Sequence, residues 1–304
     1  TNITANMTLT GGAGGDVVLT NVSTDVNASN FVSGEDLNVT LTNTDATITT
    51  GAGTNTIDAT ALDGSKTLTL DGTNGANTTV SIDEADISAG TTNDNLTIQT
   101  SGNFNNNITT GSGNDLVEGS LGTDVVNMGN GTNDVLDFSS IGIAISLTTS
   151  DIGEGNVVSG TSVNTDFTGV EKVVGDSIND DSYTVDFGNI GNFIFDGDGG
   201  SDTVALTGSG TTTLSNTNFD NIEKLDITGL NTGDTLDITY DNLKAWIETG
   251  VNEFILSVND DGTNITTENQ FQRVDNNGIT NITTIGDYTF TNGTVTEDIT
   301  LHVV

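Results

Sequence analysis

The stretch from residue 110 to residue 138, TGSGNDLVEGSLGTDVVNMGNGTNDVLDF, repeats glycine, a carboxylate and an apolar residue in fixed order. In the tandem nine-residue units 110–118 and 119–127, glycines precede an aspartate at the sixth place, and an apolar residue stands at the eighth. These residues are Asp115 and Asp124, and Val117 and Val126. Glycines permit left-handed backbone angles that turn loop carbonyls inward, and aspartate supplies a hard oxygen suited to Ca²⁺. The pattern predicts calcium-binding loops, each followed by a short strand whose apolar residue points into a core.

Further copies lie outside the tandem pair. GGAGGDVVL at 11–19 fits at every defined place, GDGGSDTVA at 197–205 has an aspartate in place of one glycine, and a third tandem unit at 128–136 is one residue too long. The competing interpretation is that Gly-Asn-Asp clusters are only turns between strands. With two further acidic turns included, the candidate metal ligands are Asp16, Asp94, Asp115, Asp124, Asp134, Asp180, Asp198 and Asp202.

These nonapeptides resemble those of the type I secreted RTX proteins, a family of secreted proteases, toxins, adhesins and S-layer proteins. The resemblance implies an all-β fold, a parallel β-roll or β-solenoid that binds several Ca²⁺ ions. It also implies secretion to the cell surface.

The charge of the chain is strongly one-sided. The 304 residues include 43 Asp and Glu but only 5 Lys and Arg, which gives a formal charge of −38, and they include no Cys and no Pro. Two carboxylates about 4 Å apart repel by roughly 4 kcal/mol at an effective dielectric of 20, so external cations must offset the acidic clusters. This charge opposes binding to nucleic acid or to an anionic membrane, and no apolar segment is long enough to span a membrane. Alternating Thr, Val, Ile and Leu favour strands over disorder.

Residues 1–140 contain short β-type runs separated by glycine-containing turns about every 20 residues. That spacing suits one coil of a β-solenoid, whose stacked coils bury a continuous core. An antiparallel sandwich with similar turn spacing is the alternative.

A second repeat occurs at 167–172 and 219–224, with the pattern Phe-x-x-Val/Ile-Glu-Lys. It is similar to the segments that link rolls in RTX adhesins. We expect Phe167 and Phe219 to be core anchors. The glutamates, Glu171 and Glu223, are expected to pair with the adjacent lysines or to ligate a metal.

The last part of the chain changes character. The sequence predicts a helix at 241–250, capped by Asp241, with an apolar face that includes Trp246, and it predicts a hairpin turn at Asn292-Gly293. This part is expected to form a β-rich capping module with Trp246 in its core; a Trp that stacks on carbohydrate is the alternative. The predicted division is therefore 1–140, 141–238 and 239–304.

The sequence gives little support for catalysis. His302 is the only histidine, no HExxH motif occurs, and no base or nucleophile is evident, so we expect no enzyme. Two structural classes remain: a surface-layer subunit that self-assembles with Ca²⁺, and a segment of a large RTX adhesin that binds a glycan or surface. Thr-x-Thr pairs raise a third possibility, an ice-binding face, but threonine is common in strands. The partners expected are copies of the chain itself and cell-surface polysaccharide, and exposed acidic residues such as Asp180 and Asp181 are expected to mediate assembly.

Overall fold

Nearly all of the regular structure is β, arranged as a parallel β-solenoid with one short α-helix. The computed structural model describes residues 3–304 apart from 12–14, 33, 64–65, 73–76, 83–85, 89–94, 101–102, 104, 209–213, 216, 231–234, 248–252, 258–269, 276–277, 283–285 and 291–298. The chain forms two units. Unit 1 comprises Thr1–Ile141 and Val157–Lys172, and unit 2 comprises Gly142–Asn156 and Val173–Val304. The predicted three-segment division stays a prediction.

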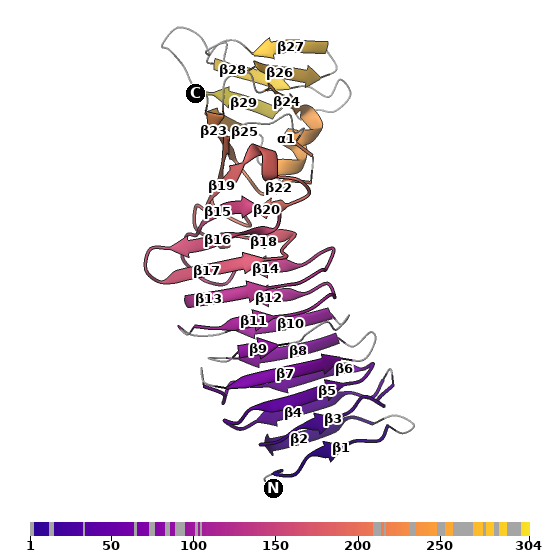
Figure 1. Ribbon diagram of the computed structural model, residues 1–304. Helices are drawn as coiled ribbons and strands as arrows, with labels where there is room; N and C mark the ends of the chain where they lie inside the picture. Colours follow the sequence, from indigo (N-terminus) through magenta and orange to yellow (C-terminus); the bar gives the residue numbers. More distant parts are fainter. Residues whose placement is uncertain are drawn as a thin grey trace. The chain divides into compact units, whose positions relative to one another are not determined.

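In unit 1 successive strands alternate between two parallel sheets, so each coil contributes to both (Figure 1). Sheet A1 contains β2 (Val17–Val22), β4 (Leu37–Leu41), β6 (Thr54–Asp58), β8 (Asn77–Ile82), β10 (Asn95–Thr100), β12 (Leu116–Glu118) and β14 (Val135–Asp137). Sheet B1 contains β1 (Met7–Thr8), β3 (Val26–Asn27), β5 (Ala46–Thr50), β7 (Thr67–Gly72), β9 (Asp86–Ser88), β11 (Asn107–Thr109), β13 (Gly122–Asn127) and β17 (Val163–Thr168).

The strand register confirms the predicted coil length. Val39 pairs with Ile57, 18 residues on, and Ile57 pairs with Val80, 23 residues on. Both pairings are parallel, as a solenoid requires, so the antiparallel sandwich is wrong.

Alternation of side chains builds the core of unit 1. In β4, Leu37, Val39 and Leu41 are buried, whereas the residues between them are partly exposed. Parallel register then stacks one buried residue of each coil on the next. In sheet A1 this column is Val39, Ile57, Val80, Ile98, Val117 and Leu136. Burial of each such side chain contributes about 1.5–3 kcal/mol relative to exposure, and the columns therefore hold the coils together.

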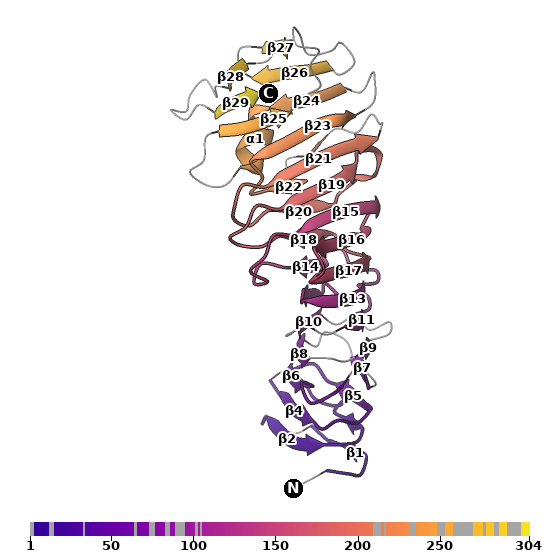
Figure 2. The same cartoon turned by 90° about the vertical axis from the view of Figure 1, so that its left-hand side faces the viewer.

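Unit 2 has the same kind of coil with additional strands near the C-terminus (Figure 2). Sheet B2 contains, in spatial order, β15 (Ser146–Asp151), β19 (Ser182–Asp186), β21 (Thr203–Gly208), β23 (Lys224–Leu230), β25 (Glu253–Ser257), β29 (Ile299–Val303) and β28 (Gly286–Phe290). Sheet A2 contains β18 (Lys172–Val174), which begins at the last residue of unit 1, β20 (Ile194–Asp196) and β22 (Phe219–Asp220). A third sheet contains β24 (Thr235–Thr239), β26 (Gln270–Asp275) and β27 (Gly278–Ile282). Strand β16 (Glu154–Ser159) begins in unit 2 and ends in unit 1, and a 3₁₀ turn covers Phe187–Asn189.

Aromatic rings fill the core of unit 2. Phe195 lies 4.7 Å from Phe193 and 6.2 Å from Phe219, measured between ring centroids. Phe219 in turn lies 4.9 Å from Trp246, which lies 6.0 Å from Phe254. All these rings are buried, so Phe219 is a core anchor as predicted.

The helix α1 (Tyr240–Trp246) begins at Tyr240, so Asp241 lies in its first turn and not at the predicted cap position, and the predicted end at residue 250 lies outside the described residues. Its predicted apolar face is confirmed, because Leu243, Trp246 and the following Ile247 are buried. The carbonyl of Trp246 accepts the Ile222 N–H at 2.7 Å, so the helix end pairs with the backbone beside β22. A fully buried Trp246 cannot stack on a carbohydrate at the surface.

The strands β28 and β29 pair antiparallel, but the predicted turn at Asn292-Gly293 lies outside the described residues. Within the part of the chain that the structure describes, no helix is both long and apolar enough to cross a membrane.

Candidate functional site: a ladder of buried carboxylates

The tandem nonapeptides together form one coil of unit 1. Asp115 directly precedes β12 in sheet A1, and Asp124 lies in β13 of sheet B1. Val117 and Val126 are buried, as predicted. The overlong third unit keeps the same arrangement, since its Asp134 and Leu136 are also buried, and its extra residue is accommodated in the loop before Asp134.

A glycine is required in that loop. Gly129 has φ +80°, and a Cβ at this position would lie 1.6 Å from the Gly111 carbonyl oxygen of the neighbouring coil. The expectation that the loop glycines include left-handed ones is therefore confirmed here.

In unit 1 the buried carboxylates join one coil to the next. Asp115 Oδ1 accepts the Leu96 N–H at 2.8 Å, Asp134 Oδ1 accepts the Asp115 N–H at 2.8 Å, and Glu171 Oε2 accepts the Asp134 N–H at 2.8 Å. Each carboxylate thus satisfies a buried donor of the preceding coil. We call this series ladder 1.

Unit 2 contains the same series, which we call ladder 2. Asp181 Oδ1 accepts the Ile145 N–H at 2.7 Å, Asp202 Oδ1 accepts the Asp181 N–H at 2.6 Å, and Glu223 Oε2 accepts the Asp202 N–H at 2.8 Å. The aspartates of ladder 1 precede strands of sheet A1, whereas those of ladder 2 precede strands of sheet B2.

In both units a residue directly before a ladder aspartate takes part in a hydrogen bond in the opposite direction; before Asp134 the donor is Thr132, whose N–H donates to Asn114 Oδ1 at 3.3 Å. Asn95 Oδ1 accepts the Asn114 N–H at 3.0 Å, and Asp180 Oδ1 accepts the Ser201 N–H at 2.9 Å. Two successive coils are therefore held by a pair of hydrogen bonds. In one, a side chain of the later coil accepts a backbone N–H of the earlier coil; in the other, a side chain of the earlier coil accepts a backbone N–H of the later coil. We call this pair a clasp. Because these donors and acceptors sit at fixed places before each strand, the clasp fixes the register of neighbouring coils.

An amide can replace the carboxylate in a clasp. Asn55 Oδ1 accepts the Leu37 N–H at 3.2 Å, while Asp36 Oδ1 accepts the Thr54 N–H at 2.8 Å. The buried Asn55 also donates to the Gly51 and Gly53 carbonyls. The clasp therefore needs an oxygen acceptor but not a negative charge.

In sheet B1, Asp124 occupies a clasp of its own. Its Oδ1 accepts the Asn106 N–H at 2.8 Å and the Asn106 side-chain amide at 3.1 Å, and its Oδ2 accepts the Ser120 hydroxyl at 3.1 Å. Burial raises the pKa of Asp124, and these hydrogen bonds oppose that rise.

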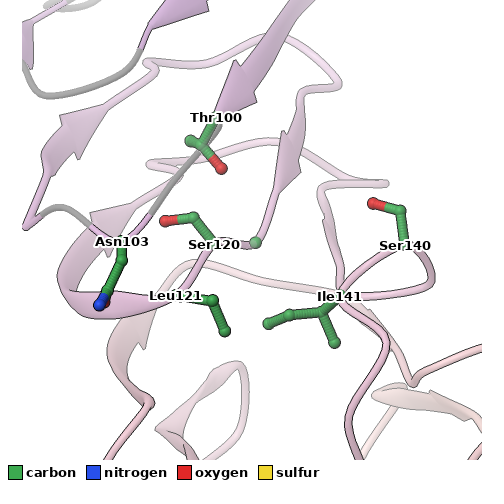
Figure 3. A pocket seen from close by; sticks show the side chains of 7 residues that line it. Thr100, Asn103, Ser120, Leu121, Ser140 and Ile141 are labelled. Atoms are coloured by element: carbon green, nitrogen blue, oxygen red, sulfur yellow. The ribbon is translucent and has the colours of Figure 1, made fainter.

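Ser120 also lines a surface pocket of about 370 Å³ (Figure 3). The remaining lining residues are Thr100, Asn103, Gly119, Leu121, Ser140 and Ile141. Hydroxyls, one amide and aliphatic side chains surround this space, and none of the lining side chains is charged. A pocket of this composition supplies no acid, base or activated nucleophile of its own.

Burial changes the protonation of the ladder carboxylates. Desolvation, reinforced by neighbouring carboxylates, raises the pKa of Asp134 to about 7, that of Asp202 to about 8 and that of Asp181 to about 6. Hydrogen bonds to the ladder oxygens oppose these shifts. Burial also acts to raise the pKa of Asp176, but hydrogen bonds from Asn179, Gly142 and Ile178 outweigh it, and the pKa of Asp176 is lowered. Near neutral pH the ladder therefore favours a proton or a cation beside its carboxylates.

The predicted ligands divide into several environments. The buried ones are Asp115, Asp124, Asp134 and Asp202, and the exposed ones are Asp16 and Asp180. Asp198 is partly exposed and has φ +60°, a left-handed angle that favours glycine. Asp94 lies outside the described residues. The calcium assignment of all these residues stays a prediction.

The copy at 11–19 departs from the expected geometry. Val18, expected to point into the core, is 67% exposed, and the buried residue is Leu19. The register explains the difference. Val17 pairs with the buried Leu37, so Asp16 is level with Asp36 and lies one residue before the buried position of its coil.

The oxygens beside the ladders are of the type that Ca²⁺ prefers. Asp134 Oδ2 and Asp202 Oδ2 are buried and have no hydrogen-bond partner within the described structure. At Gly197, an added Cβ would lie 2.2 Å from Asp202 Oδ2 and 2.3 Å from the Asn221 carbonyl oxygen, so these two oxygens converge above the glycine. Carboxylate and carbonyl oxygens fit Ca²⁺. The described residues contain no group of three or more acidic or histidine side chains placed to hold a metal, so further backbone oxygens would have to complete such a site.

Several ladder members were not foreseen as such. Asp181, expected on an exposed acidic cluster, is buried at 2% exposure, so that expectation is wrong. Asn55 and the two motif glutamates were not predicted to bond backbone N–H groups of another coil. The sequence does carry a signal for the ladder aspartates: each directly precedes a strand and follows a polar residue, as in Asn114-Asp115 and Asp180-Asp181.

Comparison with known proteins gives no match: no family model, no curated protein and no solved structure is similar to this chain at a significant level.

Proposed function

We propose that the chain is a structural module of a bacterial cell surface, stabilised by Ca²⁺ and able to assemble with copies of itself into a surface layer. The observation that carries the proposal is the pair of ladders, in which buried carboxylates with uncommitted oxygens join successive coils. Such a body gains rigidity when a cation neutralises the carboxylates. Each unit would hold an ion of its own, beside Asp134 in unit 1 and beside Asp202 and the Asn221 carbonyl in unit 2.

The charge of the chain supports the assembly part of the proposal. With a net charge of −38, two copies repel each other. A divalent ion coordinated by carboxylates of both copies turns this repulsion into attraction, whereas monovalent salt only screens it. Mg²⁺ loses its water reluctantly and would bridge poorly.

A non-enzymatic role is favoured by the chemistry of the described pocket and of the histidine. The pocket is lined by neutral side chains. His302 lies on the surface of sheet B2, where its Nδ1 contacts Asp287 Oδ1 at 2.8 Å, and both side chains are partly or largely exposed. A water-excluding catalytic site needs more than this pair.

The test uses the full chain in chelator, in millimolar Ca²⁺ and in millimolar Mg²⁺, followed by light scattering and negative-stain electron microscopy. We expect ordered assemblies with Ca²⁺ and few or none with Mg²⁺ or chelator. Asp180→Asn removes an exposed charge while keeping the oxygen that accepts the Ser201 N–H, so it should weaken assembly more than folding. Asp181→Asn, at the adjacent buried ladder position, loses one of the two backbone N–H bonds that Asp181 accepts and should instead weaken folding more than assembly.

A chain that stays monomeric at every Ca²⁺ concentration would overturn the surface-layer proposal. If the same sample then binds a glycan tightly, the adhesin alternative takes its place.

A further inference from the structure

Both ladders end at the glutamate of a Phe-x-x-Val/Ile-Glu-Lys segment. Ladder 1 ends at Glu171 and ladder 2 ends at Glu223. Each glutamate accepts the N–H of the last ladder aspartate at the same distance, 2.8 Å. The two segments therefore make the same hydrogen bond, each within its own unit.

The backbone of the glutamate behaves differently from that of a ladder aspartate. The N–H of an aspartate points to the following coil, as when Asp181 donates to Asp202 Oδ1. The N–H of Glu223 instead donates back to the Asp202 carbonyl at 3.3 Å, and the Lys224 N–H donates to the same oxygen at 2.9 Å. A carbonyl oxygen has two lone pairs and can accept both.

Unit 1 repeats this reversal. The N–H groups of Glu171 and Lys172 both donate to the Asp134 carbonyl oxygen at 3.0 Å. By contrast, in the coil before it only Val135, the residue after the aspartate, donates to the Asp115 carbonyl. The glutamate N–H thus needs no acceptor from a following coil.

The turn before the glutamate is also shared. The third residue of each segment has a left-handed backbone, with φ +72° at Gly169 and φ +49° at Asn221. The fourth residue is buried in both, as Val170 and Ile222. The glutamate thus returns its own N–H to the aspartate carbonyl while its side chain accepts the aspartate N–H at 2.8 Å.

We propose that Phe-x-Gly/Asn-Val/Ile-Glu-Lys is a ladder-closing motif, in which the extra methylene of glutamate lets one residue satisfy the last aspartate N–H and return its own N–H to the same aspartate. A buried N–H left without an acceptor destabilises the fold, so a ladder of clasps needs such an end wherever the carboxylate series stops. The motif allows each unit to hold a complete ladder of its own. This role requires neither calcium nor assembly, and it holds whether or not the proposed function is correct.

The test is amide hydrogen exchange on the full-length chain with side chains of matched chemistry. Glu223→Gln keeps the length and an acceptor oxygen, and the Asp202 amide should keep its protection to within about threefold. Glu223→Asp keeps the charge but shortens the reach, and exchange of the Asp202 amide should accelerate about tenfold or more, as expected for the loss of one buried hydrogen bond. Circular dichroism of each variant checks that the fold persists.

Glu171→Gln and Glu171→Asp repeat the comparison in unit 1 with the Asp134 amide as the probe, and they decide the question if a Glu223 variant fails to fold. Glu154→Asp, at an exposed position, is the control for a general effect of shortening and should change neither amide. If Glu→Asp protects the aspartate amide as well as Glu→Gln does, length plays no part and the motif is an ordinary ladder step.

Discussion

The two units use similar coils but bury different side chains. The sheet A1 column of unit 1 is aliphatic, running from Val39 to Leu136, whereas unit 2 packs a continuous series of aromatic rings from Tyr183 to Phe254. The spacing of successive ladder aspartates also differs. It is 19 residues in unit 1, from Asp115 to Asp134, and 21 residues in unit 2, from Asp181 to Asp202. The comparison shows that the clasp, and not the identity of the core, is what the coils have in common.

The largest effect should come from truncation of the aromatic core. Phe195 is fully buried and contacts the rings of Tyr183, Phe193 and Phe219. We expect Phe195→Ala to lower the free energy of unfolding of unit 2 by about 3–5 kcal/mol, because the site loses buried area and keeps a cavity. Denaturant titration followed by hydrogen exchange measures the loss and locates it.

Leu136→Ala is the matched change in unit 1, with an expected cost of about 2–5 kcal/mol. Each variant should accelerate exchange mainly in its own unit. If either one accelerates exchange equally in both units, the units are a single cooperative block and the comparison between them fails.

The second prediction concerns pH in the absence of divalent ions. The folded pKa of Asp134 is about 7 and that of Asp202 is about 8, against an ordinary value of 3.8. Between about pH 4 and pH 8 the folded chain therefore binds more protons than the unfolded chain, and the free energy of unfolding falls as pH rises. We expect a total loss of roughly 2–4 kcal/mol from pH 5 to pH 8 in chelator, measured by urea titration.

Ladder 2 should be the more sensitive, because Asp202 faces the carboxylates of Asp181, Glu223 and Asp180. Asp202→Asn removes the titrating group and keeps the acceptor, as Asn55 does naturally, so it should flatten the pH dependence of unit 2. Asp166→Asn, at an exposed position, is the control. Stability that rises from pH 5 to pH 8 in chelator would contradict the raised pKa values.

The third prediction separates the clasp acceptor from its charge in unit 1. Asp134→Ala leaves the Asp115 N–H without its acceptor at 2.8 Å, and we expect a loss of about 1–3 kcal/mol in the free energy of unfolding. Asp134→Asn retains an acceptor and should cost less than about 1 kcal/mol. Equal losses for the two variants, measured by thermal and urea unfolding in chelator, would show that charge and not hydrogen bonding matters at this position.

Much of the fold follows from the sequence, because it depends on local periodicity. Strand-type alternation and turns about every 20 residues predict the coils, and the buried Val117, Val126, Phe167 and Phe219 lie where the motifs place them. The role of the carboxylates does not follow in the same way. A glycine-rich loop with an aspartate before a strand has the same sequence whether the aspartate binds an ion or a backbone N–H of the next coil.

Two further features depend on register, which the local pattern does not determine. Asp16 matches the nonapeptide but is one place out of phase, because Val17 pairs with Leu37. Glu171 bonds a donor 37 residues earlier, across the segment that contains β15 and β16. Contacts of this kind are set by the number of residues in an intervening coil, and they appear only when the coils are stacked.

The last prediction concerns the left-handed position of the ladder-closing motif, which is glycine in unit 1 and asparagine in unit 2. At Gly169, with φ +72°, a Cβ would lie 2.7 Å from the Gly129 carbonyl oxygen, so Gly169→Ala adds a close contact to backbone strain. Gly160 has φ +54° with no heavy atom within 4 Å of its added Cβ, so Gly160→Ala carries strain alone. We expect Gly160→Ala to lower the free energy of unfolding by about 1 kcal/mol and Gly169→Ala to lower it by roughly 1–2 kcal/mol more.

Asn221→Gly removes the strain in unit 2 but also the hydrogen bond from the Asn221 amide to Asp196 at 2.8 Å, so its net effect on the free energy of unfolding should stay within about 1 kcal/mol. Urea titration of the three variants gives the order of their losses in the free energy of unfolding. Equal losses for Gly169→Ala and Gly160→Ala would show that the close approach of Gly169 to the Gly129 carbonyl does not restrict the side chain at this turn.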